Sequence, residues 1–524
     1  MNSRQMFDRR KIGLAALLIL VLIAIGLGSV SRARARASWQ QKVDPWVLEK
    51  TVTHGEAEFL IVLDEQADLS AAANKAGKLE KGTYVYQQLT AVARRTQPAV
   101  IDALQQSGSD YQSFWVSNMI WVRGDAAVVE NMARRFDVAQ IYANPRVKLD
   151  VMGPLMSPRS EETADSVEWN IVLVKATDVW DSGVSGQGAV IGGQDTGYDW
   201  QHPALINQYR GWDGTVADHD YNWHDAIHED DPSTSPGNPC GFDSPQPCDD
   251  YGHGTHTMGT MVGDDGESNQ IGMAPKAEWI ACRNMEQGWG TPATYAECYE
   301  WFIAPYPLGG DPLQDGDPAK APHVINNSWS CPPSEGCTDP EILHQVVDSV
   351  RAAGILTAHS AGNSGPSCGS IAEPAAIYDA SYTVGATDSQ DVIAGFSARG
   401  PVTAGENSLI KPDISAPGVS VRSSIRGNNY ASFSGTSMAA PHVAGLVGLL
   451  VSANPVLAGN VAGLEQIIKD TAVPLTTDQG CGGDASDAVP NHVYGWGRID
   501  ALAAYQEVVG EFSHLFYTPV WLGE

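Results

Sequence analysis

Short strands alternate with helices along the larger, C-terminal part of this sequence. The candidate strands are short apolar runs, and segments with helical spacing of apolar residues separate or follow them. Because a helix between two strands lets them lie parallel in one sheet, this order predicts an α/β fold, a three-layer, mainly parallel sheet with helices on both faces. The predicted strands are 189–193, 323–327, 355–360 and 382–384, and the predicted helices are 294–304, 340–353, 437–452 and 463–470.

The first 164 residues differ in charge from the rest of the chain. They hold 20 Lys and Arg against 17 Asp and Glu, a net charge of +3, whereas residues 165–524 hold 12 against 45, a net charge of -33. Such a difference is typical of two separate functional units. The acidity excludes nucleic acid as a partner, because phosphate binding needs clustered Lys and Arg. It suits a soluble monomer outside a cell.

Residues 56–152 have the pattern of a small α/β unit. We expect strands at 59–63, 114–122, 138–142 and 147–151, helical segments within 70–106 broken at Gly77, Gly82 and Pro98, and a helix after Asp125 that carries Val128, Val129, Met132 and Phe136. The polar, proline-containing stretch 153–164 is expected to be a linker where the chain is processed by proteolysis.

Residues 1–37 have the features of a targeting segment. Basic residues between positions 4 and 11 precede an uncharged apolar run over 12–31, and Ala35-Arg36-Ala37 resembles a signal-peptidase site. The run is also long enough to span a bilayer, and the arginines that follow it oppose simple translocation. We therefore expect export, with this segment either cleaved as a signal peptide or retained as a signal anchor.

The eight cysteines all lie beyond residue 239, and in an exported chain an even number indicates disulfides. The short loops Cys240–Cys248 and Cys331–Cys337 are suited to pairing, although the sequence leaves the full connectivity open.

Three glycine-containing segments could hold reactive side chains where strands end or helices begin. Asp195 closes a predicted strand, His253 lies among glycines, and Ser437 stands at the start of an apolar helix with Pro441 expected in its first turn. Ser437 alone fits a nucleophile or a helix cap equally well. A serine nucleophile needs an imidazole base, and the imidazole needs a carboxylate. The three residues together predict a catalytic triad in the order Asp, His, Ser.

These motifs resemble those of the subtilisin-like serine proteases (subtilases), most closely the bacillopeptidase F group. The resemblance covers about 165–505 and is carried by 195–197, 253–256, 360–363 and 435–445. It implies an autoprocessing serine endopeptidase that acts on polypeptides, with Asp195, His253 and Ser437 as the triad and Asn363 as an oxyanion donor. Gly193-Gln194 departs from the family, which usually has two apolar residues there.

The resemblance also implies a substrate site in which two chain segments flank an extended peptide. Trp289 and Trp329 would be walls of this site, with core aromatics as the alternative, whereas His256, His359 and His442 are expected to be structural. The implied substrate-binding residues are Ser328, Trp329, Ser330, Gly288, Trp289, Gly290, Ser360, Ala361 and Gly362.

By the same resemblance, 56–152 is an inhibitory propeptide, 165–510 the catalytic domain and 511–524 a C-terminal tail. The chemistry needs no cofactor. The acidic segment 218–250 is either a site for structural calcium or a solvated loop.

The leading hypothesis is a secreted monomer. The alternatives are a membrane-tethered processing protease of narrow specificity, held by 12–31, and a catalytically silent binding module, which the presence of all four site residues disfavours.

Overall fold

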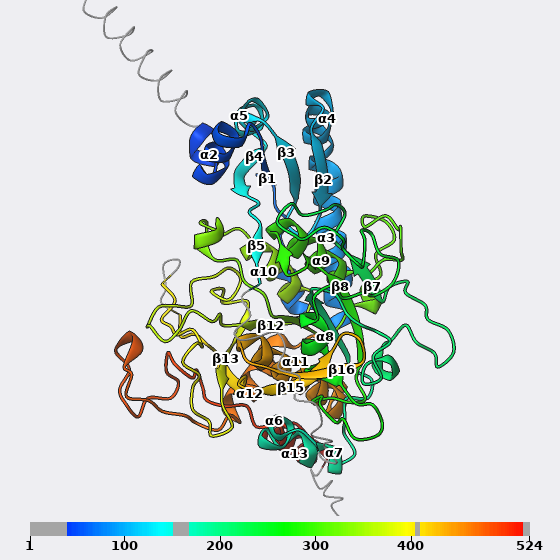
Figure 1. Cartoon of the computed structure of the whole chain (residues 1–524), viewed down its shortest axis with the longest axis vertical. Coiled ribbons are helices and arrows are strands. Elements are labelled where there is room, and N and C mark those ends of the chain that lie inside the picture. The colour runs from blue at the N-terminus through cyan, green and yellow to red at the C-terminus, as the bar shows by residue number, and fades with distance from the viewer. Residues whose placement is uncertain (1–38, 150–166, 404–408, 517–524) are drawn as a thin grey trace, which may run out of the picture.

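The computed structural model describes residues 39–149, 167–403 and 409–516 as a small N-terminal domain and a larger C-terminal domain (Figure 1). The predicted targeting segment, the predicted linker 153–164 and the last part of the predicted tail lie outside the described residues. The final helix, α13 (Ala501–Phe516), continues past the expected domain boundary at residue 510.

A seven-stranded sheet forms the middle layer of the C-terminal domain, and all its strand pairs are parallel. This confirms the predicted fold class. The strand order is β14 (Ile414–Pro417), β13 (Tyr382–Thr387), β12 (Leu356–Ser360), β11 (Val324–Asn327), β6 (Val190–Asp195), β8 (Glu278–Arg283) and β7 (Trp223–Asp225). The four predicted strands correspond to β6, β11, β12 and β13.

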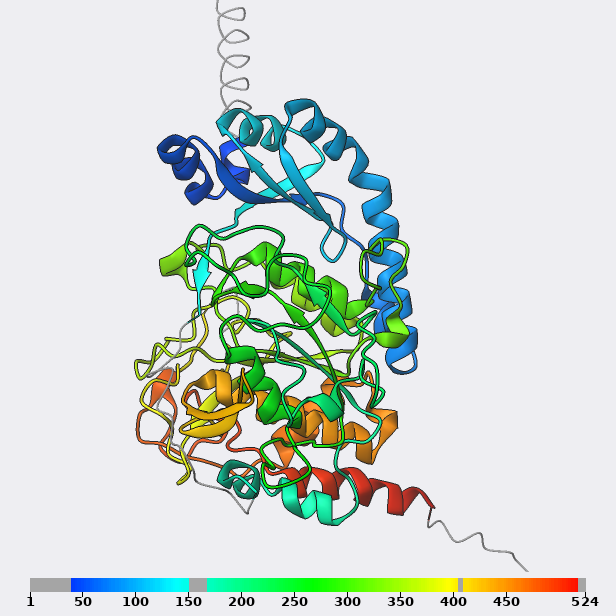
Figure 2. The same ribbon diagram turned by 45° about the vertical axis from the view of Figure 1, so that its right-hand side comes forward.

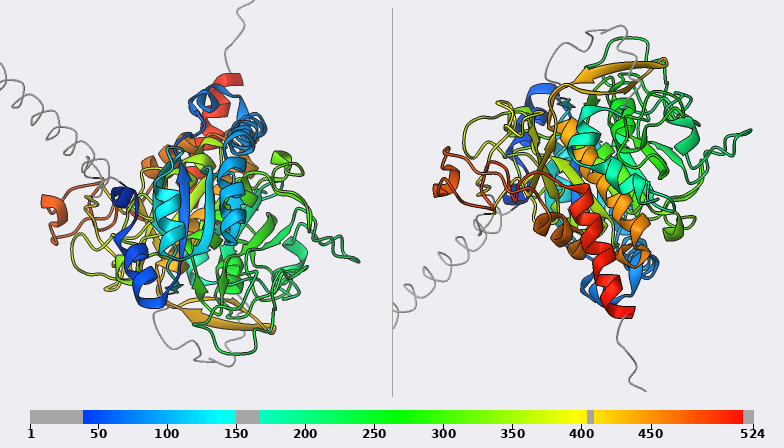
Figure 3. Two further views of the ribbon diagram at one scale, coloured as in Figure 1. Left: turned by 90° about the horizontal axis from the view of Figure 1, so that it is seen from above. Right: turned by 90° about the horizontal axis from the view of Figure 1, so that it is seen from below.

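Helices cover both faces of this sheet (Figures 2 and 3). One face carries α8 (His253–Val262), α11 (Thr436–Ala453), α12 (Val461–Asp470) and α13, with the short helices α6 (Trp169–Leu173) and α7 (Ala176–Asp181) beneath; the other carries α9 (Pro292–Ile303) and α10 (His344–Ala352). Helix α11 is long and apolar enough to cross a membrane by length and composition, but 89% of it is buried in the protein. It is the central core helix.

Pro441 lies in the second turn of α11 and not in the first turn, as the sequence suggested. A proline there cannot donate to the carbonyl four residues earlier, which belongs to Ser437. That carbonyl instead accepts a hydrogen bond from the hydroxyl of Ser328 at 2.9 Å. The helix therefore keeps its proline because a side chain from the neighbouring strand end replaces the missing donor.

The N-terminal domain is an antiparallel sheet covered by helices. Its strand order is β2 (Asp110–Phe114), β3 (Met119–Gly124), β1 (Ala57–Leu63) and β4 (Val138–Ala143), and its helices are η1 (Trp39–Lys42), α2 (Pro45–His54), η2 (Ser70–Asn74), α3 (Gly77–Thr96), α4 (Pro98–Ser107) and α5 (Ala126–Ala133). Val43 and Val47 are buried in its core. The domain therefore begins before the expected residue 56.

Three local predictions for this domain were wrong. The single strand expected over 114–122 is a β2–β3 hairpin, because the chain turns at Asn118, which has φ 45°. Gly82 does not break α3; it lies in a close helix contact where a Cβ would come within 3.2 Å of the Pro318 Cβ. Phe136 is 91% exposed because α5 ends before it.

The hairpin tip of the N-terminal domain contacts α9 and α10. The Glu300 carboxylate accepts hydrogen bonds from the backbone N–H groups of Trp115 and Val116, and the Ser349 hydroxyl donates to the Val116 carbonyl at 2.8 Å. At another point between the domains, Arg146 pairs with Asp231 at 3.2 Å. The basic N-terminal part thus meets the acidic domain through ion pairs as well as backbone hydrogen bonds.

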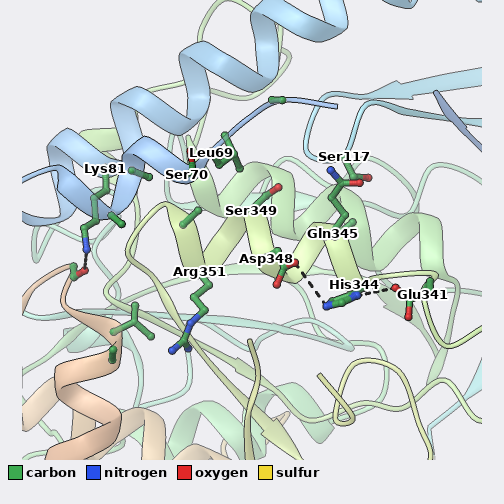
Figure 4. A pocket seen from close by; sticks show the side chains of 18 of the residues that line it. Leu69, Ser70, Lys81, Ser117, Glu341, His344, Gln345, Asp348, Ser349 and Arg351 are labelled. Carbon is green, nitrogen blue, oxygen red and sulfur yellow. Dashed lines mark hydrogen bonds and ion pairs between the residues drawn. The ribbon is translucent and has the colours of Figure 1, made fainter. Parts of the chain in front are cut away.

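A cavity of about 870 Å³ lies beside this contact, between the N-terminal domain and α10 (Figure 4). Lys81 and Ser117 line one side, and His344, Asp348 and Arg351 line the other. The two domains therefore meet at separated points with an open space between them.

Four disulfides link the eight cysteines. The two pairings expected from loop length, Cys240–Cys248 and Cys331–Cys337, are confirmed. The others are Cys282–Cys298, which joins β8 to α9, and Cys368–Cys481.

Replacing Leu450 of α11 with alanine should lower the free energy of unfolding by about 2–5 kcal/mol, because the side chain is fully buried and its loss leaves a cavity. Val456→Ala, at a position 77% exposed, should change it by less than about 0.5 kcal/mol. Urea unfolding of both variants measures the difference. Equal midpoints and slopes in the urea unfolding curves of the two variants would contradict the central place of α11 in the core.

Candidate active site

Asp195 and His253 form a buried pair at the carboxyl edge of the sheet. Asp195 is the last residue of β6 and His253 is the first residue of α8. The Nδ1 atom of His253 lies 2.8 and 2.9 Å from the two carboxylate oxygens. Because a carboxylate can only accept, Nδ1 carries the proton, and Nε2 is left as the basic nitrogen.

Asp249 holds the turn that leads into His253. Its carboxylate accepts hydrogen bonds from the backbone N–H of Gly252 at 2.7 Å and from the hydroxyls of Thr255 at 2.5 Å and Thr196 at 3.0 Å. Burial raises the pKa of Asp249. The sequence interpretation treated Asp249 only as one of many acids. Its spacing, three residues before the glycine at the N-cap of α8, was the available signal.

Ser437 is the second residue of α11 and is 6% exposed. Its hydroxyl donates to the Ser328 carbonyl at 3.3 Å, while its own carbonyl accepts from the Ser328 hydroxyl at 2.9 Å. Ser328, which was expected to bind substrate, thus contacts Ser437 through both its carbonyl and its hydroxyl. Helices α8 and α11 pack against each other, and a Cβ on Gly445 of α11 would lie 3.1 Å from the Met261 carbonyl of α8.

The orientation of Asn363 is fixed by Thr436. The Asn363 side-chain oxygen accepts from the backbone N–H and from the hydroxyl of Thr436, both at 3.0 Å. The N–H of Gly362 in turn donates to the Thr436 hydroxyl at 3.2 Å. The amide nitrogen of Asn363 therefore points away from Thr436. The loop after β12 is tied to the start of α11, where the helix dipole favours negative charge.

The predicted substrate segment 288–290 is already paired with the chain itself. β10 (Trp289–Gly290) forms antiparallel pairs with β9 (Met285–Glu286) on one side and with β5 (Val147–Lys148) on the other. The Gly288 carbonyl accepts from the N–H of Leu149 at 2.7 Å. The tail of the N-terminal domain thus lies along the edge that we expected to hold substrate.

The other predicted substrate residues differ in their surroundings. Trp329 is 4% exposed and stacks on Tyr295 with ring centroids 3.9 Å apart, so here it is a core aromatic, whereas Trp289 is half-buried. Ser330 is half-buried beside Trp329. At the end of β12, the N–H of Ala361, which follows Ser360, donates to the Val384 carbonyl at 3.0 Å.

Gln194, which departs from the family pattern, joins buried side-chain amides beneath Asp195. Its Nε2 donates to Asn327 Oδ1 at 2.6 Å, and Asn284 Nδ2 donates to its Oε1 at 3.0 Å. Gly193 leaves room beside this network, since a Cβ there would lie 2.5 Å from the Tyr198 hydroxyl. Hydrogen bonds thus replace the apolar packing expected under the aspartate.

The three histidines expected to be structural are buried and hydrogen-bonded. His256 lies 3.1 Å from the carbonyls of Val421 and Ala431, His359 lies 3.0 Å from the Tyr299 hydroxyl, and His442 is 2.9 Å from the Met438 carbonyl. Burial lowers the pKa of His256 and of His359 to about 3 and that of His442 to about 4. They are therefore neutral at physiological pH.

Among the described residues, the acidic segment 218–250 holds no group of three or more His, Cys, Asp or Glu arranged to hold a metal ion. Several acids have protein partners instead: Glu229 with Arg123, Asp231 with Arg146, Asp225 with Arg283, Asp243 with His228, and Asp250 with the N–H of Gln287. These contacts are ion pairs and backbone hydrogen bonds, not converging oxygen ligands.

The sequence matches one family of known proteins. A family model described as the subtilase family matches residues 186–497. Bacillopeptidase F of Bacillus subtilis (strain 168) is 34% identical over 504 residues, 90% of this chain and 32% of the relative, so the chain spans about a third of that protein's length. Subtilisin Savinase of Lederbergia lenta is 33% identical over 342 residues, 65% of this chain and 99% of the relative. Subtilisin E of Bacillus subtilis (strain 168) is 30% identical over 298 residues, 56% of this chain and 64% of the relative.

Gln194→Met should lower the free energy of unfolding by about 1–3 kcal/mol for each buried amide left without its partner. Gln201→Met replaces an exposed glutamine with the same side chain and should cost less than about 0.5 kcal/mol. Chemical denaturation of the two variants gives the comparison. If both behave alike, the amides beneath Asp195 do not depend on Gln194.

Proposed function

Because the chain belongs to the subtilase family, we propose that it is an exported, autoprocessing serine endopeptidase that hydrolyses peptide bonds in polypeptides. The observation that carries this proposal is the buried pair of Asp195 and His253, with Nδ1 2.8 Å from the carboxylate, at the start of a helix that packs against α11, which holds Ser437. A buried carboxylate that orients an imidazole is needed for general-base catalysis and is not needed for a helix cap.

In the proposed mechanism, the Ser437 hydroxyl attacks the scissile carbonyl. It first leaves its hydrogen bond to the Ser328 carbonyl and turns toward Nε2 of His253, which takes its proton. His253 later gives this proton to the leaving amine, and Asp195 stabilises the imidazolium in between. A water molecule activated by the same imidazole then releases the acyl group.

The negative oxygen of the tetrahedral intermediate would be bound by two donors. These are the side-chain amide of Asn363 and the backbone N–H of Ser437 at the start of α11. Thr436 supports this role, because its N–H and its hydroxyl both donate to the side-chain oxygen of Asn363 and so turn the amide nitrogen away from Thr436. The donors are therefore oriented before substrate arrives.

We assign the N-terminal domain, residues 39–149, as an inhibitory propeptide. In support, its β5 tail lies along β10, and its hairpin tip is held by Glu300. The match to Bacillopeptidase F covers 90% of the chain, more than the C-terminal domain alone could supply, so it includes part of this domain. Self-cleavage would follow within 148–166, and the freed domain would leave as an inhibitor that dissociates.

We infer secretion, since the disulfides suit an oxidising compartment. The apolar run 12–31 favours one second candidate, a membrane-tethered processing protease of narrow specificity. Fractionation of cells and medium separates the two.

The proposed chemistry uses protein groups alone and acts in a monomer. Structural calcium is not part of the proposal, because the acids of 218–250 do not converge.

A Ser437→Ala chain should accumulate uncleaved, because the proposed nucleophile also performs the first cut. A Ser452→Ala chain, altered near the other end of the same helix, should mature normally. Cell-free synthesis without other proteases, followed by N-terminal sequencing, tests both, and a fluorophosphonate should label only the chain that keeps Ser437. Normal maturation of Ser437→Ala would rule out autoprocessing.

Asn363→Ala should lower kcat by about 10²–10³-fold, equivalent to about 2.7–4 kcal/mol, with little change in KM; this is the magnitude known for the corresponding donor of subtilisin itself. Ser364→Ala, at the exposed neighbouring position, should leave both constants nearly unchanged. Steady-state kinetics on one peptide substrate measures both variants. A rise in KM without loss of kcat would argue against the oxyanion role.

A further inference from the structure

The loop closed by the Cys331–Cys337 disulfide, residues 331–337, contacts the tail of the N-terminal domain. We call it the disulfide loop. Val147 of the tail forms a small apolar cluster with the two cysteines, and the three residues are 1%, 0% and 1% exposed. The disulfide is therefore the apolar surface on which this one tail side chain is buried.

The next tail residue, Lys148, is contacted from both sides. Its backbone N–H donates to the Glu335 carboxylate of the disulfide loop at 3.0 Å. Its ammonium lies 5.6 Å from the centre of the Trp289 ring, within reach of a cation–π interaction. Glu335 thus fixes the backbone at this position, and Trp289 interacts with the side chain.

The disulfide loop fits closely against the N-terminal domain. Gly336 has φ 115°, and a Cβ there would come within 2.8 Å of the Pro145 Cβ and 2.9 Å of the Trp46 Nε1. Wider movement of the loop is limited by its disulfide, which closes a separation of six residues. A constrained loop loses little entropy when a peptide binds.

Backbone pairing and side-chain contacts have different consequences at this edge. The pairs of Gly290 with Val147 and of Trp289 with Lys148 form with any extended peptide and carry little selectivity. The apolar disulfide and the Trp289 ring distinguish side chains. An acidic group against the disulfide would lose its hydration without gaining a partner, and an acidic group over the ring would be repelled.

We propose that the disulfide loop and Trp289 select the substrate of this enzyme. The preferred substrate is an extended peptide with a β-branched aliphatic residue against the Cys331–Cys337 disulfide, followed directly by Lys or Arg over Trp289. This inference rests on the proposed function, since it assumes that substrate takes the place of the tail after the N-terminal domain has left. It adds Cys331, Cys337 and Glu335 to the residues expected to bind substrate.

The test compares internally quenched peptides with the sequence of residues 143–158, digested by the mature enzyme. Val147→Asp in the peptide should lower kcat/KM at least tenfold, whereas Val147→Ile should change it less than about twofold. Lys148→Glu should lower it by about threefold or more, the size expected for a cation–π contact. Mass spectrometry checks that the cleaved bond stays the same.

The enzyme side of the test uses the double variant Cys331→Ala/Cys337→Ala, which should reduce the preference for valine over aspartate. Trp289→Ala should reduce the preference for lysine over glutamate. The matched control, Cys240→Ala/Cys248→Ala, removes another short disulfide and should keep both preferences. If the first double variant does not fold, the peptide comparison with the unaltered enzyme still decides the proposal.

The outcomes separate this inference from the proposed function. Equal kcat/KM for the valine and aspartate peptides, from an enzyme that labels with fluorophosphonate and digests casein, would overturn the selectivity and leave the protease assignment intact. An unaltered mature protein that neither labels nor digests casein would overturn the proposed function and the inference with it.

Discussion

Two hydrogen bonds between Ser328 and Ser437 join the strand and the helix on which the site is built. One of them follows from Pro441, which has no N–H for the Ser437 carbonyl, so that this carbonyl accepts from the Ser328 hydroxyl; in the other, the Ser437 hydroxyl donates to the Ser328 carbonyl. The buried helix α11 is thereby fixed against the end of β11 at the residue that needs accurate placement. Packing alone would hold the helix axis, but the hydrogen bonds also set its rotation and its position along the axis.

Polar groups inside this protein are used to hold loops that apolar packing would leave free. Asp249 fixes the turn before His253, Thr436 fixes the amide of Asn363, and Gln194 joins the amides under Asp195. Each of these groups is buried, so a group that lost its hydrogen-bond partner could not bond to water instead, and the folded protein would be less stable. These hydrogen bonds hold the loops around the candidate site in one arrangement.

The sequence allowed the fold class, four central strands and the residues of the candidate site to be predicted, because these depend on local runs and motifs. β8 was missed because charged residues stand at both its ends, and β14 because Pro417 closes it. The surroundings of Trp329 were also beyond prediction, since its partner Tyr295 is distant in sequence. The same holds for Glu300, whose hydrogen bonds join two domains. Long-range contacts of this kind leave no periodic signal.

The N-terminal domain is attached to the C-terminal domain at several points, which has a consequence for the proposed maturation. The hairpin tip at Glu300 and the tail at β10 are two of these points, and because one folded domain joins them they act as two arms of a bivalent ligand. While either arm is bound, the other is held at a high effective concentration, so cutting the connecting chain does not by itself remove the tail from β10. In the proposed maturation, the time between the first cut and full activity then depends on how tightly the two arms hold together and on the linker. It does not depend on the rate of cleavage by Ser437.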